Sequence, residues 1–414
     1  MRSLYLIKVP ILLLMANLAF GQDSSPCPTL NSSEAILKCA LEKHPKIIRN
    51  NASISISKEH QSLASQRPNP DFDMKTTYGT QGEDKVSTNE VSFTYTWELG
   101  GKRDSRINKA LTEIELSQVE KRKVQEEVYI EISKSLYRIR QLREEKHAII
   151  EALETFNKIQ KQFKSRPSLT PEQEVSLSVF QLAEADYKLR LTSLEADETA
   201  LIKGIELAIG GPFPSEIKTV LPSFRKEWPN LSEKKDDTIG SELRLAESAA
   251  KNAEANLQLA RSEGWPDLKI GPTIQQQNNG SSTGLAYGLN LSIPLPLFHT
   301  NDGGKAVASA ELAKATQDIS LKKEEISNEH QRLVQHYQKC VNALSNSPSI
   351  FEIEKNHKRI EERYAQGLVS SPLIIEAHRQ IIDIKRTLNE HEIDALESLM
   401  KIKTLEGKLI EEGI

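Results

Sequence analysis

Residues 91–103 read VSFTYTWELGGKR, and this stretch decides the fold. Its first half alternates apolar and polar residues, which is the two-residue period of a strand with one apolar face. The apolar positions are Val91, Phe93, Tyr95 and Trp97. After Gly100 and Gly101, residues 102–166 contain neither glycine nor proline and are rich in helix-forming residues. The sequence therefore predicts an aromatic strand that runs directly into a very long helix.

The predicted helix, over residues 103–165, is too long to lie within a membrane. At 1.5 Å per residue it would extend for about 95 Å, roughly three times the hydrocarbon thickness of a bilayer. Its apolar residues recur at intervals of three and four, for example at Ile107, Leu111 and Ile114. This spacing is typical of a helix that packs against other helices. The helix is therefore expected to project far from the strand that precedes it.

The chain repeats itself, with three landmarks recurring in order. Asp71 corresponds to Asp267, Gly101 to Gly304 and Leu169 to Leu368, at offsets of 196, 203 and 199 residues. Such self-similarity indicates a tandem structural repeat. The first repeat is expected over 22–209 and the second over 238–414. A proline-rich linker, 210–237, would join them.

Each repeat is expected to contain the same elements in the same order. The first has a helix over 33–66, a β-hairpin over about 71–98, the long helix, and a returning helix over 171–208. The second has a helix over 240–263, a β-hairpin over about 267–294, a long helix from 305 that is kinked at Pro348, and a returning helix over 373–406. Glycine pairs at the strand–helix junctions would change the chain direction, namely Gly100 and Gly101, then Gly303 and Gly304.

The N-terminus, MRSLYLIKVPILLLMANLAFGQ, has the pattern of a secretory signal peptide over residues 1–21. Its apolar run of about 12 residues is shorter than the ~20 that a spanning helix needs. In an exported protein Cys27 and Cys39 could form a disulfide, although the sequence leaves their pairing open. The chain has 54 basic and 58 acidic residues. This near-neutral balance gives no electrostatic basis for binding nucleic acid.

Four strands with an apolar face cannot form a membrane sheet alone, because both edges would leave backbone groups unpaired in hydrocarbon. Strands from other copies would close the sheet, and three copies would supply twelve strands, an even number within the known range of membrane barrels. We therefore expect a mainly α protein with membrane β structure. Each protomer would contribute four transmembrane strands and long helical hairpins in two tandem repeats. The assembly would be a trimeric β-barrel continued by an α-helical barrel, with Trp97 in an interfacial aromatic girdle.

The double repeat, with WELGGKR at one junction and SIPLPLFHTNDGGKA at the other, resembles the TolC family of outer-membrane efflux channels. The junction motifs are most similar to the branch that works with heavy-metal and cation pumps. The resemblance implies a homotrimer in the outer membrane of a Gram-negative-type cell, in contact with outer-membrane lipid, with the helices projecting into the periplasm. It implies two partners, a periplasmic adaptor protein and an inner-membrane transporter of the resistance-nodulation-division type.

The resemblance also implies roles for the turns that join the helices of each hairpin. These turns would dock onto the adaptor or pump, through Ser168, Leu169 and Thr170 in the first repeat and Gly367, Leu368, Val369 and Ser370 in the second. The acidic residue just past the second turn, Glu376, is the candidate gate, since a ring of carboxylates would narrow a closed pore and favour cations. The alternative is that Glu376 is an ordinary exposed charged residue on a helix. Glu174, in the first repeat, is a weaker gate candidate.

No catalytic motif is present, so we expect no enzyme activity and no cofactor. The histidines, His330, His336, His357, His378 and His391 among them, are scattered along predicted helices. We therefore expect exposed or packed helix residues and no metal site. Cys340 is expected to be a small packing residue. The rival to a transport channel is a periplasmic adaptor or structural coiled-coil protein that does not span the membrane. Its β domain should have a compact core of its own.

Overall fold

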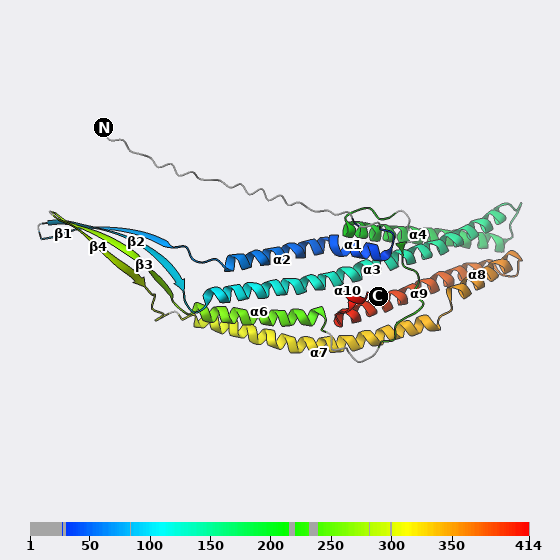
Figure 1. Cartoon of the computed structure of the whole chain (residues 1–414). Helices are drawn as coiled ribbons and strands as arrows, with labels where there is room; N and C mark the ends of the chain where they lie inside the picture. Colours follow the sequence, from blue (N-terminus) through cyan, green and yellow to red (C-terminus); the bar gives the residue numbers. More distant parts are fainter. Residues whose placement is uncertain are drawn as a thin grey trace, which may run out of the picture.

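The computed structural model describes residues 27, 30–82, 84–214, 220–231, 239–280, 282–298 and 300–413. The predicted signal peptide, 1–21, lies outside the described residues. Figure 1 shows an elongated molecule in which a sheet forms one end and long helices run from it to the opposite end. The fold is mainly helical with four antiparallel strands, as the sequence predicts.

The four strands form one antiparallel sheet in the order β1-β2-β3-β4. They are β1 (Asp71–Gln81), β2 (Asp84–Glu98), β3 (Asp267–Asn279) and β4 (Ser282–Ser292). The pairing of Trp97 with Leu268 lies in the β2–β3 ladder. The two predicted hairpins, one from each repeat, are thereby joined into a single sheet.

The predicted first helix, 33–66, is in fact two helices, α1 (Ser33–Lys43) and α2 (Pro45–Ala64). The break lies at His44, whose ψ of 134° is not helical. A residue before proline is sterically pushed out of the helical region, and Pro45 has no N–H to continue the helix. The His44 Nδ1 atom accepts a hydrogen bond from the Lys46 N–H at 3.1 Å and so caps α2.

The long helix of the first repeat, α3 (Lys102–Lys164), is continuous over 63 residues, a length of about 95 Å. The returning helix, α4, spans Pro171–Ile209. Leu136, Ile139 and Leu142 are among the buried residues of α3. Their spacing of three residues places them along the face that packs against neighbouring helices. The predicted long helical hairpin is therefore present.

The second repeat contains α6 (Ser241–Glu263), α7 (Asp302–Asn346), α8 (Ile350–Ala365), α9 (Ser371–Leu405) and the short α10 (Leu409–Glu412). The predicted kink at Pro348 is a complete break between α7 and α8. Ser349 starts the new helix with a capping box, in which the Glu352 side chain also accepts from the Ser349 backbone N–H. α9 begins two residues earlier than expected, at Ser371.

The core is a line of packed clusters along α3 and α7. In one, Val128 and Ile132 of α3 pack with α1 and the end of α4. A second, nearer the far end, joins Leu142 and Phe156 of α3 to α4 and α9. A third joins α6, α7 and α9. The helices therefore bury their apolar stripes against one another, and none of the described helices covers the apolar face of the sheet (Figure 1).

Candidate channel, junction and docking surfaces

Apart from Val86 and Ala286, the apolar residues of all four strands lie on one face of the sheet. The register places Phe72 opposite Phe93, and Ile274 opposite both Val91 and Tyr287. Directly paired residues share a face. On this face Tyr78 is 80% exposed and Leu289 is 78% exposed. On the opposite face Ser92 and Thr94 are buried. This is the reverse of a water-soluble sheet, which covers its apolar side.

Both edges of the sheet are open. β1 pairs only with β2 and β4 pairs only with β3, and no other strand in the described part of the chain adds to either edge. Each edge therefore presents backbone donors and acceptors that a further strand could pair. The apolar surface continues past β4, where Leu295, Leu297 and Phe298 are also exposed.

At the first junction the chain turns through two left-handed residues, Gly100 (φ 72°) and Gly101 (φ 71°), before α3 begins at Lys102. Only glycine adopts this conformation without steric cost. Gly100 has a second constraint, because a Cβ atom there would lie 2.5 Å from Cδ1 of Trp265. The predicted junction is thus built by both glycines.

The second junction differs from the prediction. Its left-handed residue is Asn301 (φ 57°), and Gly303 and Gly304 lie inside the first turn of α7. Asparagine is one of the few other residues that tolerate this conformation, and here the Asn301 amide donates a hydrogen bond to the Ala260 carbonyl at 2.8 Å. Asn301, and not Gly304, is the counterpart of Gly101, and it follows Gly101 by 200 residues.

Ion pairs fix the angle between strands and helices at the first junction. Lys102 Nζ lies 2.7 Å from the Asp267 carboxylate, and Arg106 pairs with Glu98. Lys102 begins α3 whereas Asp267 begins β3, so the first contact links the two repeats. Both acidic side chains come from strand ends, and both basic side chains come from the first turns of α3.

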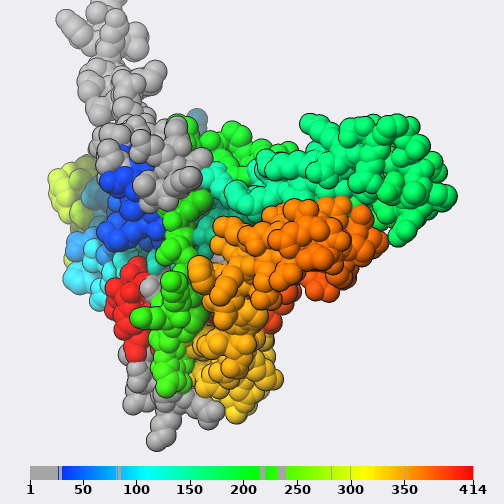
Figure 2. Space-filling view, turned by 90° about the vertical axis from the view of Figure 1, so that its right-hand side faces the viewer, coloured from blue at the N-terminus to red at the C-terminus, as the bar shows by residue number. Residues whose placement is uncertain are grey.

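The two helical turns lie together at the end of the molecule farthest from the sheet (Figure 1). Figure 2 views the molecule from that end, with the α3–α4 tip in green beside α8 in orange. In the first turn Ser168 is exposed, and Thr170 caps α4 in a capping box with Gln173. Pro171 is at the start of that helix, where the missing N–H costs nothing.

The second turn is closed by a Schellman motif. Gly367 (φ 72°) ends α8, its N–H donating to the Tyr364 carbonyl at 2.9 Å, and the Leu368 N–H donates to the Arg363 carbonyl at 3.0 Å. Leu368 is 64% exposed, so an apolar side chain stands at the tip. Ser370 precedes α9 by one residue, as Thr170 precedes α4, again at an offset of 200. This aligns Leu169 with Val369, not with Leu368.

Glu376 lies in the second turn of α9 with its side chain 40% exposed. Its carboxylate accepts two hydrogen bonds from Arg379, at 2.6 and 2.8 Å, and one from Gln380 at 2.9 Å. These bonds lower the pKa of the Glu376 carboxyl. The group is therefore a carboxylate at neutral pH, beside a guanidinium that offsets part of its charge. Glu174 lies in the first turn of α4 at the neighbouring tip.

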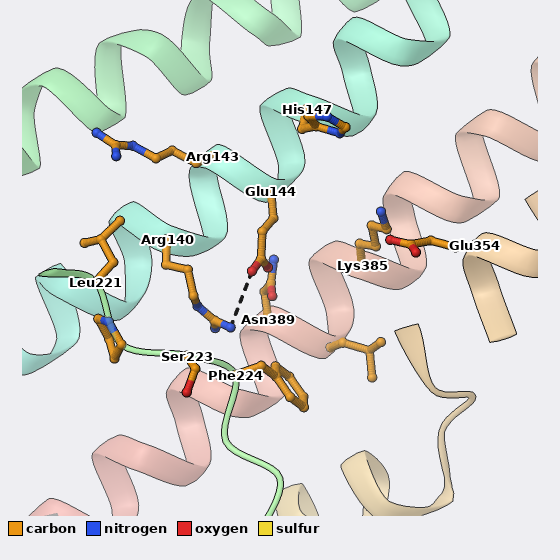
Figure 3. A pocket seen from close by; sticks show the side chains of 12 residues that line it. Arg140, Arg143, Glu144, His147, Leu221, Ser223, Phe224, Glu354, Lys385 and Asn389 are labelled. Atoms are coloured by element: carbon orange, nitrogen blue, oxygen red, sulfur yellow. Dashed lines mark ion pairs between the residues drawn. The ribbon is translucent and has the colours of Figure 1, made fainter. Parts of the chain in front are cut away.

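A buried polar cluster holds the link between the repeats against α3 and α9. Glu392 is fully buried, pairs with Arg140, and accepts from Gln141 at 2.8 Å and from the Arg225 backbone N–H at 3.0 Å. A cavity of about 600 Å³ adjoins this cluster and is lined by α3, α8, α9 and residues 221–224 (Figure 3). Burial raises the pKa of Glu144, which faces Arg140 in the cavity. No local motif in the sequence indicates this cluster, since its members are far apart in the chain.

Two of the histidines, which lie 21 residues apart in the sequence, contact each other in the structure. His357 of α8 and His378 of α9 bring their Nε2 atoms to 3.0 Å of each other. Burial lowers the pKa of His357, and the adjacent His378 lowers it further. His330 is buried and its Nε2 atom lies 3.1 Å from Glu406. The sequence contains one local indication of the pair's surroundings, a glutamate one helical turn after His357, at Glu361.

The structure contains one disulfide, between two cysteines whose pairing the sequence leaves open. Cys27 and Cys39 form a disulfide with Cα atoms 5.6 Å apart, at the cluster that joins α1 to α3. Cys340 has a free thiol and is buried in α7. Among the described helices, none is long and apolar enough to cross a membrane.

Comparison with known proteins gives a likeness in structure alone. No protein-family model matches the sequence, and no curated protein matches it. The MtrE outer membrane channel of Neisseria gonorrhoeae, solved in its open state, superposes with a TM-score of 0.68 at 14% identity, covering 92% of this chain and 90% of that one. The CmeC outer membrane channel of Campylobacter jejuni gives 0.66 at 12% identity, covering 91% and 85%.

CusC, described in terms of folding and transmembrane channel formation, gives a TM-score of 0.65 at 13% identity, covering 92% of this chain and 93% of that one. Each superposition covers about nine-tenths of this chain. At these identities the likeness establishes the fold. This chain has the fold of the TolC-type outer-membrane channels.

Proposed function

We propose that this protein is the outer-membrane channel of a tripartite efflux system, a passive and non-enzymatic conduit from periplasm to exterior. It would work as a homotrimer in the outer membrane, with the helices in the periplasm. One observation carries the proposal: a sheet with an exposed apolar face and two open edges continues directly into long helices, of which α3 is about 95 Å long. Water-soluble monomers rarely expose a contiguous apolar face of this kind.

The strands support a trimer. One protomer offers four, and its open edges β1 and β4 can pair only with strands from another chain. Three protomers joined β4 to β1 would make a twelve-stranded closed barrel with its apolar face toward lipid. Trp97, 61% exposed near the helix end of the sheet, would lie in the aromatic girdle at the periplasmic interface.

The docking proposal concerns the two tips. Ser168, Leu169 and Thr170 in the first turn, and Gly367 to Ser370 in the second, lie at the end farthest from the sheet. The partners would be a periplasmic adaptor and an inner-membrane transporter. The exposed apolar side chain of Leu368 would be the contact most sensitive to substitution, because burying it on a partner would remove apolar surface from water.

The gate proposal concerns Glu376. In a trimer three Glu376 carboxylates could face a shared axis near the tips, where their side chains would narrow the closed pore and their negative charge would favour cations, while their mutual repulsion would oppose closure. Arg379 offsets part of this charge. The Arg379 guanidinium is therefore expected to weaken the cation selectivity that Glu376 confers.

Single-channel conductance in a planar bilayer tests the channel proposal and the gate proposal. The purified trimer should insert and give small, cation-selective currents that enlarge in Glu376→Ala. Arg379→Ala should raise cation selectivity, and Glu34→Ala, which removes an exposed carboxylate of α1, is the control. Unchanged currents in both α9 variants would remove Glu376 from the gate and leave the channel intact. A folded, soluble periplasmic monomer that never inserts would instead favour the adaptor alternative.

The cargo is a narrower proposal. The junction motifs GGKR and PLPLF resemble those of the heavy-metal and cation branch, which supports metal cations as cargo and a resistance-nodulation-division pump as partner. Growth of a strain lacking the chain tests this, on graded copper, silver, zinc and cobalt salts and on organic toxicants. Sensitivity restricted to metals would support the cation cargo. Sensitivity to organic compounds alone would overturn it without affecting the channel.

A further inference from the structure

Three side chains with metal-binding atoms converge near the far end of the molecule. His357 and Glu361 are one turn apart on α8, and His378 faces them from α9. The two Nε2 atoms are 3.0 Å apart. The Glu361 Oε1 atom lies 3.5 Å from the His357 Nε2 atom and 3.4 Å from the His378 Nε2 atom. Three ligand atoms thus form a nearly equilateral triangle.

Two edges of this triangle match one face of a zinc coordination tetrahedron, and the third, between the two Nε2 atoms, is about 0.3 Å shorter. Zinc binds histidine nitrogen and carboxylate oxygen at about 2.0–2.2 Å, which places neighbouring ligand atoms about 3.3–3.5 Å apart. We propose that His357, Glu361 and His378 form a binding site for Zn²⁺ or a similar borderline divalent cation. The fourth position faces away from the protein ligands and would hold water. Two imidazoles and a carboxylate suit this ion better than Mg²⁺ or Ca²⁺, which prefer oxygen ligands alone.

The surroundings orient the ligands as metal sites require. The His378 Nδ1–H group donates to the Ile374 carbonyl at 2.8 Å, which leaves the Nε2 lone pair free to face the ion. The Thr155 hydroxyl donates to the Glu361 carboxylate at 3.0 Å. The Phe156 ring packs against His378 with centroids 5.5 Å apart. The two bonds come from α9 and α3, so both helices hold the ligands in place.

Burial is graded across the site. The His378 side chain is 2% exposed, His357 is 14% exposed and Glu361 is 35% exposed. An ion can therefore enter from the Glu361 side and bind against the buried imidazole. Without an ion, a hydrogen on the His357 Nε2 atom bridges to His378. Binding moves that hydrogen to Nδ1 of His357, so that both Nε2 lone pairs are available and the proton count is unchanged.

The site has a structural consequence at the tip. Its ligands lie on either side of the second turn, His357 and Glu361 before Gly367 and His378 after it. A bound ion would clamp α8 to α9, and through Thr155 it would hold the hairpin against α3. The site is thus a regulator of tip rigidity, separate from any cation that passes through a pore.

Zinc titration of the purified, metal-stripped full-length chain tests the proposal, by calorimetry and by the visible d–d bands of Co²⁺ in the same site. We expect one ion per protomer and tetrahedral Co²⁺ bands. His357→Gln and Glu361→Gln should each weaken binding at least about 10-fold. Thr155→Val, which removes an orienting hydrogen bond, should weaken it about 10-fold. His147→Gln is the control, since His147 is an exposed histidine on α3.

The variants distinguish Zn²⁺ binding at the proposed site from Zn²⁺ binding by exposed side chains. Binding that is lost in His357→Gln and kept in His147→Gln supports the site, provided that both variants show the wild-type circular dichroism and assembly state. Glu361→Gln keeps the histidine pair intact, so it also tests the site without disturbing the packing of His378. Equal Zn²⁺ affinity in wild type, His357→Gln and Glu361→Gln would overturn the proposal. So would the absence of Zn²⁺ binding by the folded wild-type chain.

Discussion

Gly100 lies directly against the indole of Trp265, with the position of a Gly100 Cβ atom only 2.5 Å from Cγ and Cδ1 of that ring. Trp265 precedes the first strand of the second repeat, and Gly100 precedes the long helix of the first. The close approach therefore sets how the two repeats meet at the base of the sheet. Neighbouring Gly101 has the same left-handed backbone, but no atom lies within 4 Å of its Cβ position.

Substituting Gly100 and Gly101 in turn separates the cost of a left-handed backbone from the cost of a steric clash with Trp265. Gly101→Ala should cost about 1–2 kcal/mol, the penalty of a left-handed alanine. Gly100→Ala should cost about 1–3 kcal/mol more, because the ring must also move. Thermal melting of the detergent-solubilised protein and its assembly yield would measure the difference. Equal destabilisation by the two substitutions would show that the Trp265 contact is not constraining.

Breaking the buried ion pair between Arg140 and Glu392 should be strongly destabilising. Glu392→Leu leaves the buried Arg140 guanidinium with only the partly exposed Glu144 carboxylate, 3.6 Å away, at a cost of about 3–5 kcal/mol. The double substitution with Arg140→Leu should recover much of that loss, since both buried charges of the pair are then removed. Removing the exposed pair of Glu34 and Lys38 is the control, with little effect on the free energy of unfolding expected. A double variant no more stable than Glu392→Leu would contradict this account.

Glu126 should make stability fall as the pH rises from mildly acidic values. Burial raises the pKa of the Glu126 carboxyl above 4.5, against the opposing hydrogen bond from Ser241. Between 4.5 and the raised value the folded state holds a proton that the unfolded state has lost, so deprotonation favours unfolding. Glu126→Gln, which stays neutral and can still accept from Ser241, should remove this slope.

Melting temperatures of wild type and Glu126→Gln, measured from about pH 4 to pH 8, would test the sign. The variant should gain relative to wild type as the pH rises through the window and keep its advantage above it. Glu34→Gln is the control, because the pKa of the exposed Glu34 is lowered by Lys38 and its change runs in the opposite direction. A relative gain of Glu126→Gln at low pH would refute the assignment.

Loss of the disulfide between Cys27 and Cys39 should loosen the packing of α1 on α3. The bond closes a short loop, whose constraint on the unfolded chain contributes about 3 kcal/mol. The double substitution of both cysteines by alanine should lower the melting temperature, and a reducing agent should lower it in wild type alone. Cys340→Ala is the control for a buried free thiol. If reduction leaves the wild-type melting temperature unchanged, the bond makes no contribution.

The repeat was readable from the sequence, but its register was not. Matching residue types paired Gly101 with Gly304, since both are glycines before a helix. The structure pairs Gly101 with Asn301, because backbone conformation at a helix start is set by φ and by contacts such as that of the Asn301 amide with Ala260. With this correction, each helix of the first hairpin begins 200 residues before the corresponding helix of the second hairpin.

The break at His44 was missed for a related reason. The apolar period continues through Pro45. Proline is common at the first position of a helix and disruptive in a helix interior, so its presence alone does not decide between one helix and two. The break between α7 and α8 was expected only as a kink, although Pro348 and the Ser349 capping box together mark a new helix. The capping residues indicate helix boundaries that the apolar periodicity alone does not indicate.

The sequence by itself determined the strands, the long helix and their direct connection. These features depend on side-chain periodicity and on the absence of glycine and proline between 102 and 166, which act over a few residues along the chain. Only the tertiary structure decided which distant side chains meet. Arg140 reaches Glu392 and His357 reaches His378 because helices of opposite direction pack at a particular rotation. That rotation is set by the summed burial of many apolar contacts, and no local pattern records it.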